Sequence, residues 1–188
     1  KVDGNGHTCA GLSPALAVDR ANATCIDVAD LPALAADHAC SVDELTNGIR
    51  EHDWTLKVVA RAMRARRDLQ RHDAEFMQLW RQSDLDLDLI DHEYGSRASA
   101  NDAHFALPRG TDELPKYVDE SLDQDAPPIN AVGLYATFHA AALRLAKESQ
   151  VATDPKRADS LRTRAILSEA FAIHFLEDLF SSGHIVGT

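Results

Sequence analysis

The stretch LRTRAILSEAFAIHFLEDLFSSGH (residues 161–184) indicates a buried helix, yet it carries two histidines and an aspartate among its apolar residues. His174 and Asp178 are four residues apart, so their side chains share one face of such a helix. A buried carboxylate or imidazole is costly unless a partner satisfies it. Gly183 predicts the end of the helix, and His184 follows it, free to turn back towards that face.

These three polar residues form the pattern His-x3-Asp-x5-His. Two nitrogen ligands and one carboxylate are a mixture that suits zinc. An Asp–His hydrogen bond inside a core, with the second histidine merely solvated, is the alternative interpretation. Further candidate ligands favour the metal, because His52 begins a second helix and Asp91 and His104 flank a loop of small residues.

Capping residues predict several other helices. Asp30 followed by Pro32 is typical of a helix start, since the first turn does not need the N–H that proline lacks. Ser41 and Glu44 have the spacing of a capping box. Asp154 before Pro155 predicts the start of the helix that carries the histidines, and residues 129–149 predict the helix before it.

The longest predicted helix runs from Trp54 to about Arg81, with the basic run RARRDLQR on its solvated face. Its apolar residues recur at helical spacing and form one stripe: Trp54, Val58, Ala62, Leu69, Phe76 and Trp80. The period-two segment SDLDLDLIDHEYG (residues 83–95) has no partner strand nearby, so we expect an extended connection there. We expect a long loop at 95–128. The predicted fold class of the chain is an all-α helical bundle.

Composition favours one soluble globular domain, with 188 residues, 45% of them hydrophobic and 26% charged. We expect a single helical domain over 1–188, made of a loop-rich segment at 1–45 and a metal-binding core at 46–188.

The net charge of −11 argues against broad binding of nucleic-acid phosphates. No apolar run approaches the ~18 residues of a membrane span. The cysteines predict one disulfide and an oxidising compartment, hence a secreted or periplasmic protein: they are Cys9, Cys25 and Cys40.

In order and spacing, the motifs resemble the bacterial zinc-dependent phospholipase C family and its relatives, the single-strand-specific zinc nucleases. The family's hallmark helix bears His-x3-Asp-x5-His, the same spacing as the motif that begins at His174. Upstream the family has an aspartate and then a histidine in an HF dipeptide, to which Asp91 and His104 are similar. His52 is similar to a histidine that opens a long helix. The resemblance covers residues 50 to 188, with an insertion before His174.

The resemblance implies a helical bundle of the phospholipase C and nuclease type that holds two or three zinc ions. Asp178 would bridge two metals, and Asp91 would be both a bridging ligand and the general base for an attacking water. Such a cluster neutralises negative charge, so an acidic chain can bind a phosphodiester. The ligands that the resemblance implies are His52, Asp91, His104, His174, Asp178 and His184.

The chain also departs from the family. SSGH (residues 181–184) stands where members carry Gln-Pro before the second hallmark histidine, and Lys1 stands where many have a zinc-binding tryptophan. The family's two further downstream ligands would lie beyond Thr188, so we expect a chain truncated at its C-terminus. These differences indicate a divergent branch.

His38 is a seventh candidate ligand. It precedes His52 by fourteen residues, and an internal imidazole could replace the missing terminal amine. Its other nitrogen would then need an acceptor, such as Asp37 or a carbonyl. The alternative is a polar residue that closes a helix C-terminus, where a cationic histidine is mildly favourable.

These features together predict a zinc-dependent phosphoric ester hydrolase, most simply a phospholipase C that acts on phospholipid head groups with transient contact to a membrane surface. A zinc nuclease or nucleotidase is the alternative within enzymes, but the chain is only 6% aromatic, which disfavours base stacking and specific nucleic-acid binding. A non-catalytic helical protein with a partial metal site is the alternative outside enzymes.

Overall fold

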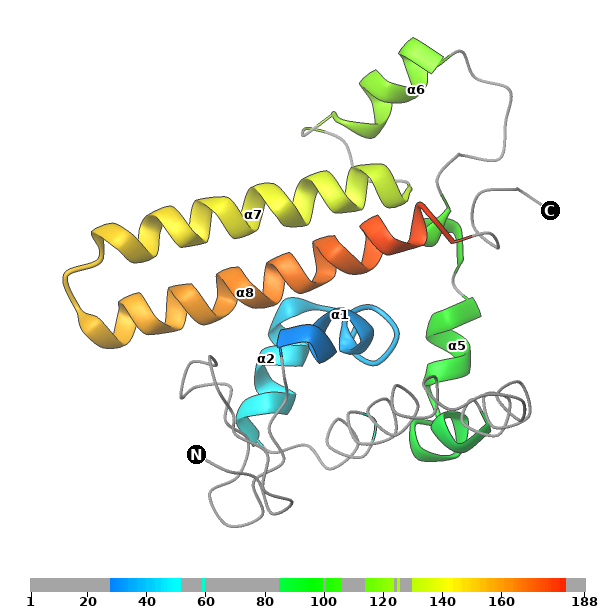
Figure 1. Ribbon diagram of the computed structural model, residues 1–188, viewed down its shortest axis with the longest axis horizontal. Helices are drawn as coiled ribbons and strands as arrows, with labels where there is room; N and C mark the ends of the chain where they lie inside the picture. The colour runs from blue at the N-terminus through cyan, green and yellow to red at the C-terminus, as the bar shows by residue number, and fades with distance from the viewer. Residues whose placement is uncertain are drawn as a thin grey trace. The chain divides into compact units, whose positions relative to one another are not determined.

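Figure 1 shows the computed structural model of the chain. It describes residues 28–51, 59, 85–99, 101–105, 114–123, 125 and 130–181. Most of these residues are helical and none of them forms a strand, so the all-α fold class is confirmed. The chain divides into two compact units, residues 1–98 and 99–188, and each is described by itself. The bundle type and the single domain stay predictions.

The N-terminal unit begins with a short 3-10 helix η2 (Val28–Asp30), which leads into the one-turn helix α1 (Leu31–Leu34). The helix start predicted from Asp30 and Pro32 is confirmed. Pro32 lies in the first turn, as expected from its missing N–H. Asp30 holds the N-cap position, but its side chain makes no capping hydrogen bond there.

A left-handed residue ends α1 and turns the chain inward. Ala36 has a φ of 62°, which costs an L-residue roughly 1–2 kcal/mol. Complete burial of Leu34 and Ala35 just before it anchors the turn. After the turn the backbone N–H of His38 donates to the Leu34 carbonyl at 3.2 Å, and the histidine is buried.

The predicted capping box begins helix α2 (Val42–Glu51). The Ser41 hydroxyl accepts from the backbone N–H of Glu44 at 3.1 Å. The Glu44 carboxylate accepts in turn from the N–H of Cys40 at 2.7 Å, one residue earlier than a capping box requires. Most of the long helix predicted after it, from Trp54 on, lies outside the described residues, apart from a buried helical Val59.

Residues 85–90 are helical, so the predicted extended connection is wrong. The N–H of Asp91 donates to the Leu87 carbonyl at 2.8 Å. In a strand Leu85, Leu87 and Leu89 would share one face, but Leu87 is 1% exposed whereas the other two are 60% and 70% exposed. Without a partner strand, a helix satisfies the backbone groups of this segment locally.

The predicted long loop at 95–128 is also wrong, because three helices occupy much of it. They are α5 (Tyr94–Ser99), the 3-10 helix η3 (Asn101–His104) and α6 (Leu114–Ser121). The proline and glycine that suggested a loop lie where helices tolerate them. Pro115 is in the first turn of α6, and Gly95 is in the first turn of α5.

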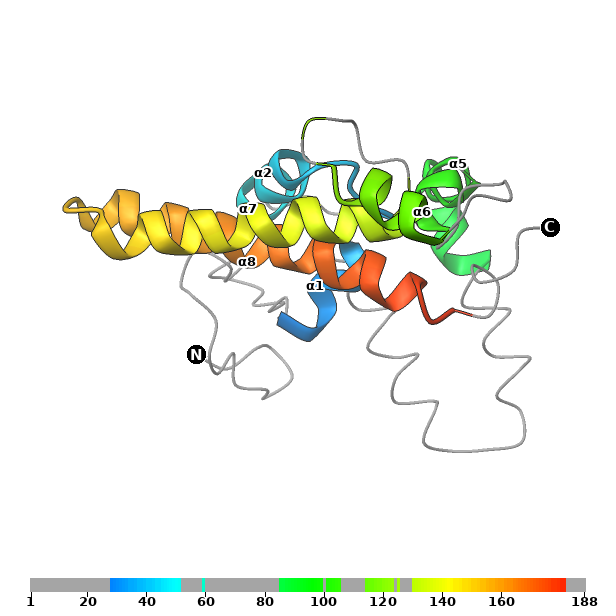
Figure 2. The same ribbon diagram turned by 90° about the horizontal axis from the view of Figure 1, so that it is seen from above.

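Two antiparallel helices build the C-terminal unit, α7 (Ala131–Val151) and α8 (Pro155–Asp178), which lie side by side along their length (Figures 1 and 2). Both predicted helix starts are confirmed. The Asn130 side chain accepts from the Gly133 N–H at 2.9 Å, and Asp154 accepts from the N–H of Lys156 at 3.1 Å. None of the described helices is long and apolar enough to cross a membrane.

Stacked phenylalanines join the two helices. The ring of Phe138 on α7 stacks on Phe171 and Phe175 of α8, with centroids 5.0 and 5.9 Å apart. Helix α8 ends at Asp178, with Leu179 as C-cap, so the helix end predicted at Gly183 is wrong. The last turn therefore places Asp178 at the end of the helix, next to residues from the rest of the unit.

Candidate metal centre

Three of the predicted ligands converge in the C-terminal unit. His104 is the last residue of η3, while His174 and Asp178 lie one turn apart at the end of α8. His104 Nδ1 is 2.6 Å from Asp178 Oδ2, and His174 Nε2 is 3.3 Å from the same oxygen. The two ring nitrogens are 3.2 Å apart. Whether the three residues bind a metal stays a prediction.

Main-chain contacts hold His104 in position. The carbonyl of the next residue, Phe105, accepts from the N–H of Ala131 at 3.0 Å, which ties the end of η3 to the first turn of α7. Since α7 packs along α8, the segment with His104 is fixed against the helix that carries the other two residues. A histidine 70 residues before His174 thereby becomes its neighbour.

The residues present fit zinc. In a tetrahedral site with Zn–N bonds of about 2.0–2.1 Å, neighbouring ligand atoms are about 3.3 Å apart. Two of the three separations match that value, and the third, between His104 and Asp178, is a short hydrogen bond. Two imidazole nitrogens that face one carboxylate oxygen would repel each other if both carried protons. A cation bound to all three atoms removes that conflict.

The surroundings keep this cluster dry and charged. The side chains of His104, His174 and Asp178 are 10%, 9% and 13% exposed, and the Phe175 ring lies against both imidazoles at 5.3 Å. Burial raises the pKa of Asp178, but hydrogen bonds and charge from the two histidines outweigh burial and hold the pKa well below its usual range. Asp178 is therefore an anion at neutral pH, as a metal ligand must be.

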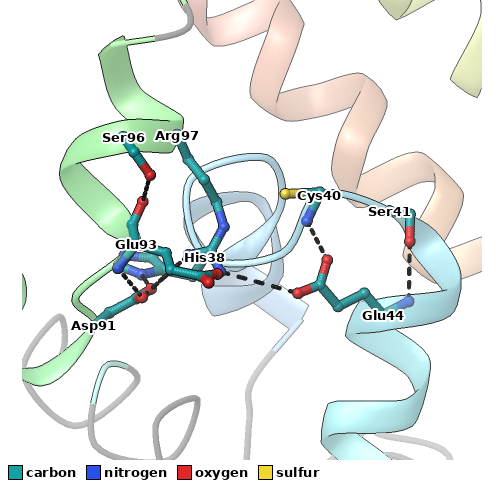
Figure 3. A network of polar contacts seen from close by, with 8 residues as sticks. All are labelled: His38, Cys40, Ser41, Glu44, Asp91, Glu93, Ser96 and Arg97. Atoms are coloured by element: carbon teal, nitrogen blue, oxygen red, sulfur yellow. Dashed lines mark hydrogen bonds and ion pairs between the residues drawn. The ribbon is translucent and has the colours of Figure 1, made fainter.

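The N-terminal unit holds a second polar cluster, shown in Figure 3. His38 Nδ1 is 2.7 Å from Asp91 Oδ2. The Nη1 group of Arg97 donates to both oxygens of Asp91, at 3.0 and 3.1 Å, and its Nη2 group donates to Glu93 at 2.6 Å. Glu44 lies 4.0 Å from the same guanidinium, so this arginine connects α2 with α5.

Burial and charge set the ionisation of this pair. Burial lowers the pKa of His38, and the neighbouring carboxylates of Asp91 and Asp37 offset only part of that effect. Burial raises the pKa of Asp91, but the hydrogen bond from His38 and the charge of Arg97 outweigh it, so the pKa of Asp91 is lowered. The pair is therefore a neutral imidazole beside an ionised carboxylate at neutral pH.

The structure does not reach every predicted ligand. His52 and His184 lie outside the described residues. Asp91 pairs with His38, a contact that the sequence did not predict, since Asp37 or a carbonyl was the expected acceptor. Arg97 was missed as well, although Glu93 and Arg97 have the i, i+4 spacing of a helical ion pair that could have indicated it.

Cys40 carries a free, exposed thiol, so it takes no part in the one disulfide that the three cysteines predict. Cys9 and Cys25 lie outside the described residues. His139 contacts both oxygens of Glu169 at 2.9 and 3.1 Å across the two long helices. That half-exposed pair resembles the cluster of His104, His174 and Asp178 but has only two members among the residues described.

Comparisons with known proteins do not extend these observations. No protein-family model, no curated protein and no solved structure matches the chain. The resemblance to the zinc-dependent phospholipase C family therefore rests on the spacing of the sequence motifs alone.

Proposed function

We propose that this protein is a zinc-dependent phosphodiester hydrolase of the phospholipase C type. The observation that supports this best is the convergence of His104 Nδ1, His174 Nε2 and Asp178 Oδ2 within 3.3 Å of one another in a buried setting. Buried polar groups from separate elements are brought together at a cost, and a bound cation offsets that cost.

Zinc held by these residues would supply a Lewis acid able to polarise a phosphoryl oxygen and to activate water. The chain's own part is to orient the ligands and to keep the carboxylate ionised. Its net charge of −11 would repel a phosphodiester, so the positive charge of the metal explains how such a substrate could bind. With His52 and His184 as further predicted ligands, two or three ions would be bound.

The packing of the aromatic residues favours a phospholipid over a nucleic acid as the substrate. Binding of single strands relies on exposed rings that stack on bases. Among the described residues, Phe138 instead stacks on Phe171 and Phe175, and Tyr135 stacks on His139, which leaves Phe180 as the single exposed aromatic ring. We therefore propose a lipid head group as the substrate, met at a membrane surface outside the cytoplasm, with zinc nuclease and non-catalytic metal protein as alternatives.

Zinc content tests the proposal most directly. We expect purified protein to contain zinc by elemental analysis, and His174→Ala to lose at least one equivalent. His139→Ala is the matched control, because it removes a histidine that also pairs with a carboxylate, and we expect its zinc content to be unchanged. Wild-type protein that binds no transition metal would refute the proposal.

Hydrolysis then separates the alternatives. We expect phosphatidylcholine vesicles and bis(4-nitrophenyl) phosphate to be hydrolysed by the zinc-loaded protein, and hydrolysis to stop on chelation. Efficient cleavage of single-stranded DNA with no action on vesicles would favour the nuclease. Zinc binding without hydrolysis of any of the three substrates would favour the non-catalytic protein.

A further inference from the structure

His38 combines complete burial with an unused ring nitrogen. Its side chain is 0% exposed, and its ring stacks on Tyr94 with centroids 4.8 Å apart and planes 10° apart. Among the residues that the structure describes, Nε2 has no hydrogen-bond partner. A buried polar atom without a partner is rare in folded proteins, and a bound water, a bound ion or a catalytic role is the usual explanation.

The partners of Asp91 determine which nitrogen of His38 carries the proton. Oδ1 of Asp91 accepts from the N–H of Glu93 at 3.2 Å and from Arg97 at 3.1 Å. Oδ2 lies 2.7 Å from His38 Nδ1 and 3.0 Å from Arg97. A carboxylate held by a guanidinium stays ionised and can only accept, so Nδ1 of His38 is the donor and Nε2 of the neutral ring carries the lone pair.

The same contacts bear on the role of Asp91. An ionised carboxylate offers about four acceptor positions, and protein donors take two on each oxygen of Asp91. A metal bound to Asp91 would displace one of these donors, whereas a metal bound to His38 Nε2 displaces none. The ligand atom that the cluster presents is therefore the imidazole nitrogen.

We propose that His38 Nε2 is a zinc ligand, and that Asp91, held by Arg97, is a positioning residue that fixes the tautomer and orientation of His38. This inference rests on the proposed function, since it assumes that the protein binds zinc. It replaces the bridging and general-base roles that the sequence motif assigned to Asp91. A carboxylate that accepts from the second nitrogen of a ligating histidine is a recurrent arrangement around zinc.

Titration of zinc into the full-length chain, first stripped with chelator, tests the ligand. We expect His38→Ala to lose one zinc equivalent or to bind zinc at least tenfold more weakly. His92→Ala is the matched control, because His92 lies next to Asp91 but is exposed, and we expect wild-type binding. Unchanged zinc stoichiometry and affinity in His38→Ala would overturn the inference. Wild-type protein without zinc would instead overturn the proposed function.

A double-mutant cycle tests the positioning role. Removal of such an orienting carboxylate typically weakens metal binding by about 10–100-fold, and we expect this for Asp91→Asn. In the His38→Ala background the same substitution should have no further effect, because Asp91 acts only through His38. Equal effects of Asp91→Asn with and without His38 would show that Asp91 binds zinc itself, and would overturn the assignment.

Two further measurements separate ligand loss from misfolding. We expect the absorption bands of bound cobalt(II) to change in His38→Ala, to shift in Asp91→Asn and to be restored by Asp91→Glu. Circular dichroism in excess chelator should show the wild-type helix content for each variant that is compared. A cobalt spectrum identical to the wild type in a folded His38→Ala variant would refute ligation by His38.

Discussion

At the scale of single residues, the buried pairs His174–Asp178 and His38–Asp91 differ in how far apart their members lie along the chain. His174 and Asp178 had to share a face, because four residues make about one turn of a helix. The carboxylate that meets His38 is Asp91, 53 positions away, and local spacing contains no information on such a contact. The neighbouring Asp37 was the natural choice from sequence, but the inward turn at Ala36 directs His38 elsewhere.

The low pKa of Asp178 makes its contribution to stability dependent on pH. Its pKa in the folded chain lies below the ordinary 3.8, so the unfolded chain takes up the proton first as the pH falls. The stabilisation is therefore complete above about pH 5 and is lost as the pH falls below 3.8 towards the folded value. In chelator at pH 7 we expect Asp178→Asn to reduce the free energy of unfolding by about 2 kcal/mol.

Urea unfolding of the wild type and Asp178→Asn at pH 7 and pH 3 measures this difference, which should shrink at the lower pH. Asp159→Asn is a control on the same helix, since Asp159 pairs with Arg162 at 3.3 Å in a solvent-exposed position. We expect Asp159→Asn to reduce the free energy of unfolding by less than about 0.5 kcal/mol, as is usual for exposed ion pairs. A difference between wild type and Asp178→Asn that grows towards pH 3 would contradict the assigned charge state.

At the scale of helices, capping residues predicted starts correctly and composition predicted loops poorly. Ser41 and Asp154, the caps that the sequence predicted for these helices, each accept from a backbone N–H of the first turn, which is a local interaction that a sequence shows directly. The alternation in residues 83–95 was misleading, because a strand also needs a partner that alternation cannot supply. Segments rich in proline and glycine form helices where these residues fall in the first turn.

The two caps of the long hairpin should differ in strength. Asn130 is 1% exposed and also donates to the Ser121 hydroxyl at 2.8 Å, whereas Asp154 is exposed. We expect Asp154→Ala to cost about 1 kcal/mol. Asn130→Ala should cost about 2–3 kcal/mol, because it removes the acceptor of a buried N–H and one hydrogen bond to the buried Ser121 hydroxyl. Urea unfolding of both variants checks which substitution lowers the free energy of unfolding more. We expect Asn130→Ser to recover part of the loss. Equal costs for Asp154→Ala and Asn130→Ala would contradict the prediction.

At the scale of the whole molecule, helix patterns predicted the all-α class, because they repeat along the chain. The division into residues 1–98 and 99–188 was not predicted, since no change of composition marks it. Each unit buries a histidine beside a carboxylate, and these are the polar groups that a small helical fold tolerates least without a ligand. The stability of the chain should therefore depend on metal.

Zinc that binds the folded chain but not the unfolded one must raise its melting temperature. At free zinc about 100-fold above the Kd, the stabilisation is about 2.7 kcal/mol. For a chain of this size that corresponds to a rise in melting temperature of roughly 5–10 °C.

We expect thermal melts followed by circular dichroism to show this difference between zinc and excess chelator for the wild type and for His139→Ala. The shift should be largely lost in His174→Ala, because that variant lacks one of three converging ligands. A wild-type melting temperature that is the same in zinc and in chelator would leave the His104, His174 and Asp178 cluster as a hydrogen-bonded core, stabilised by its own contacts and not by a metal.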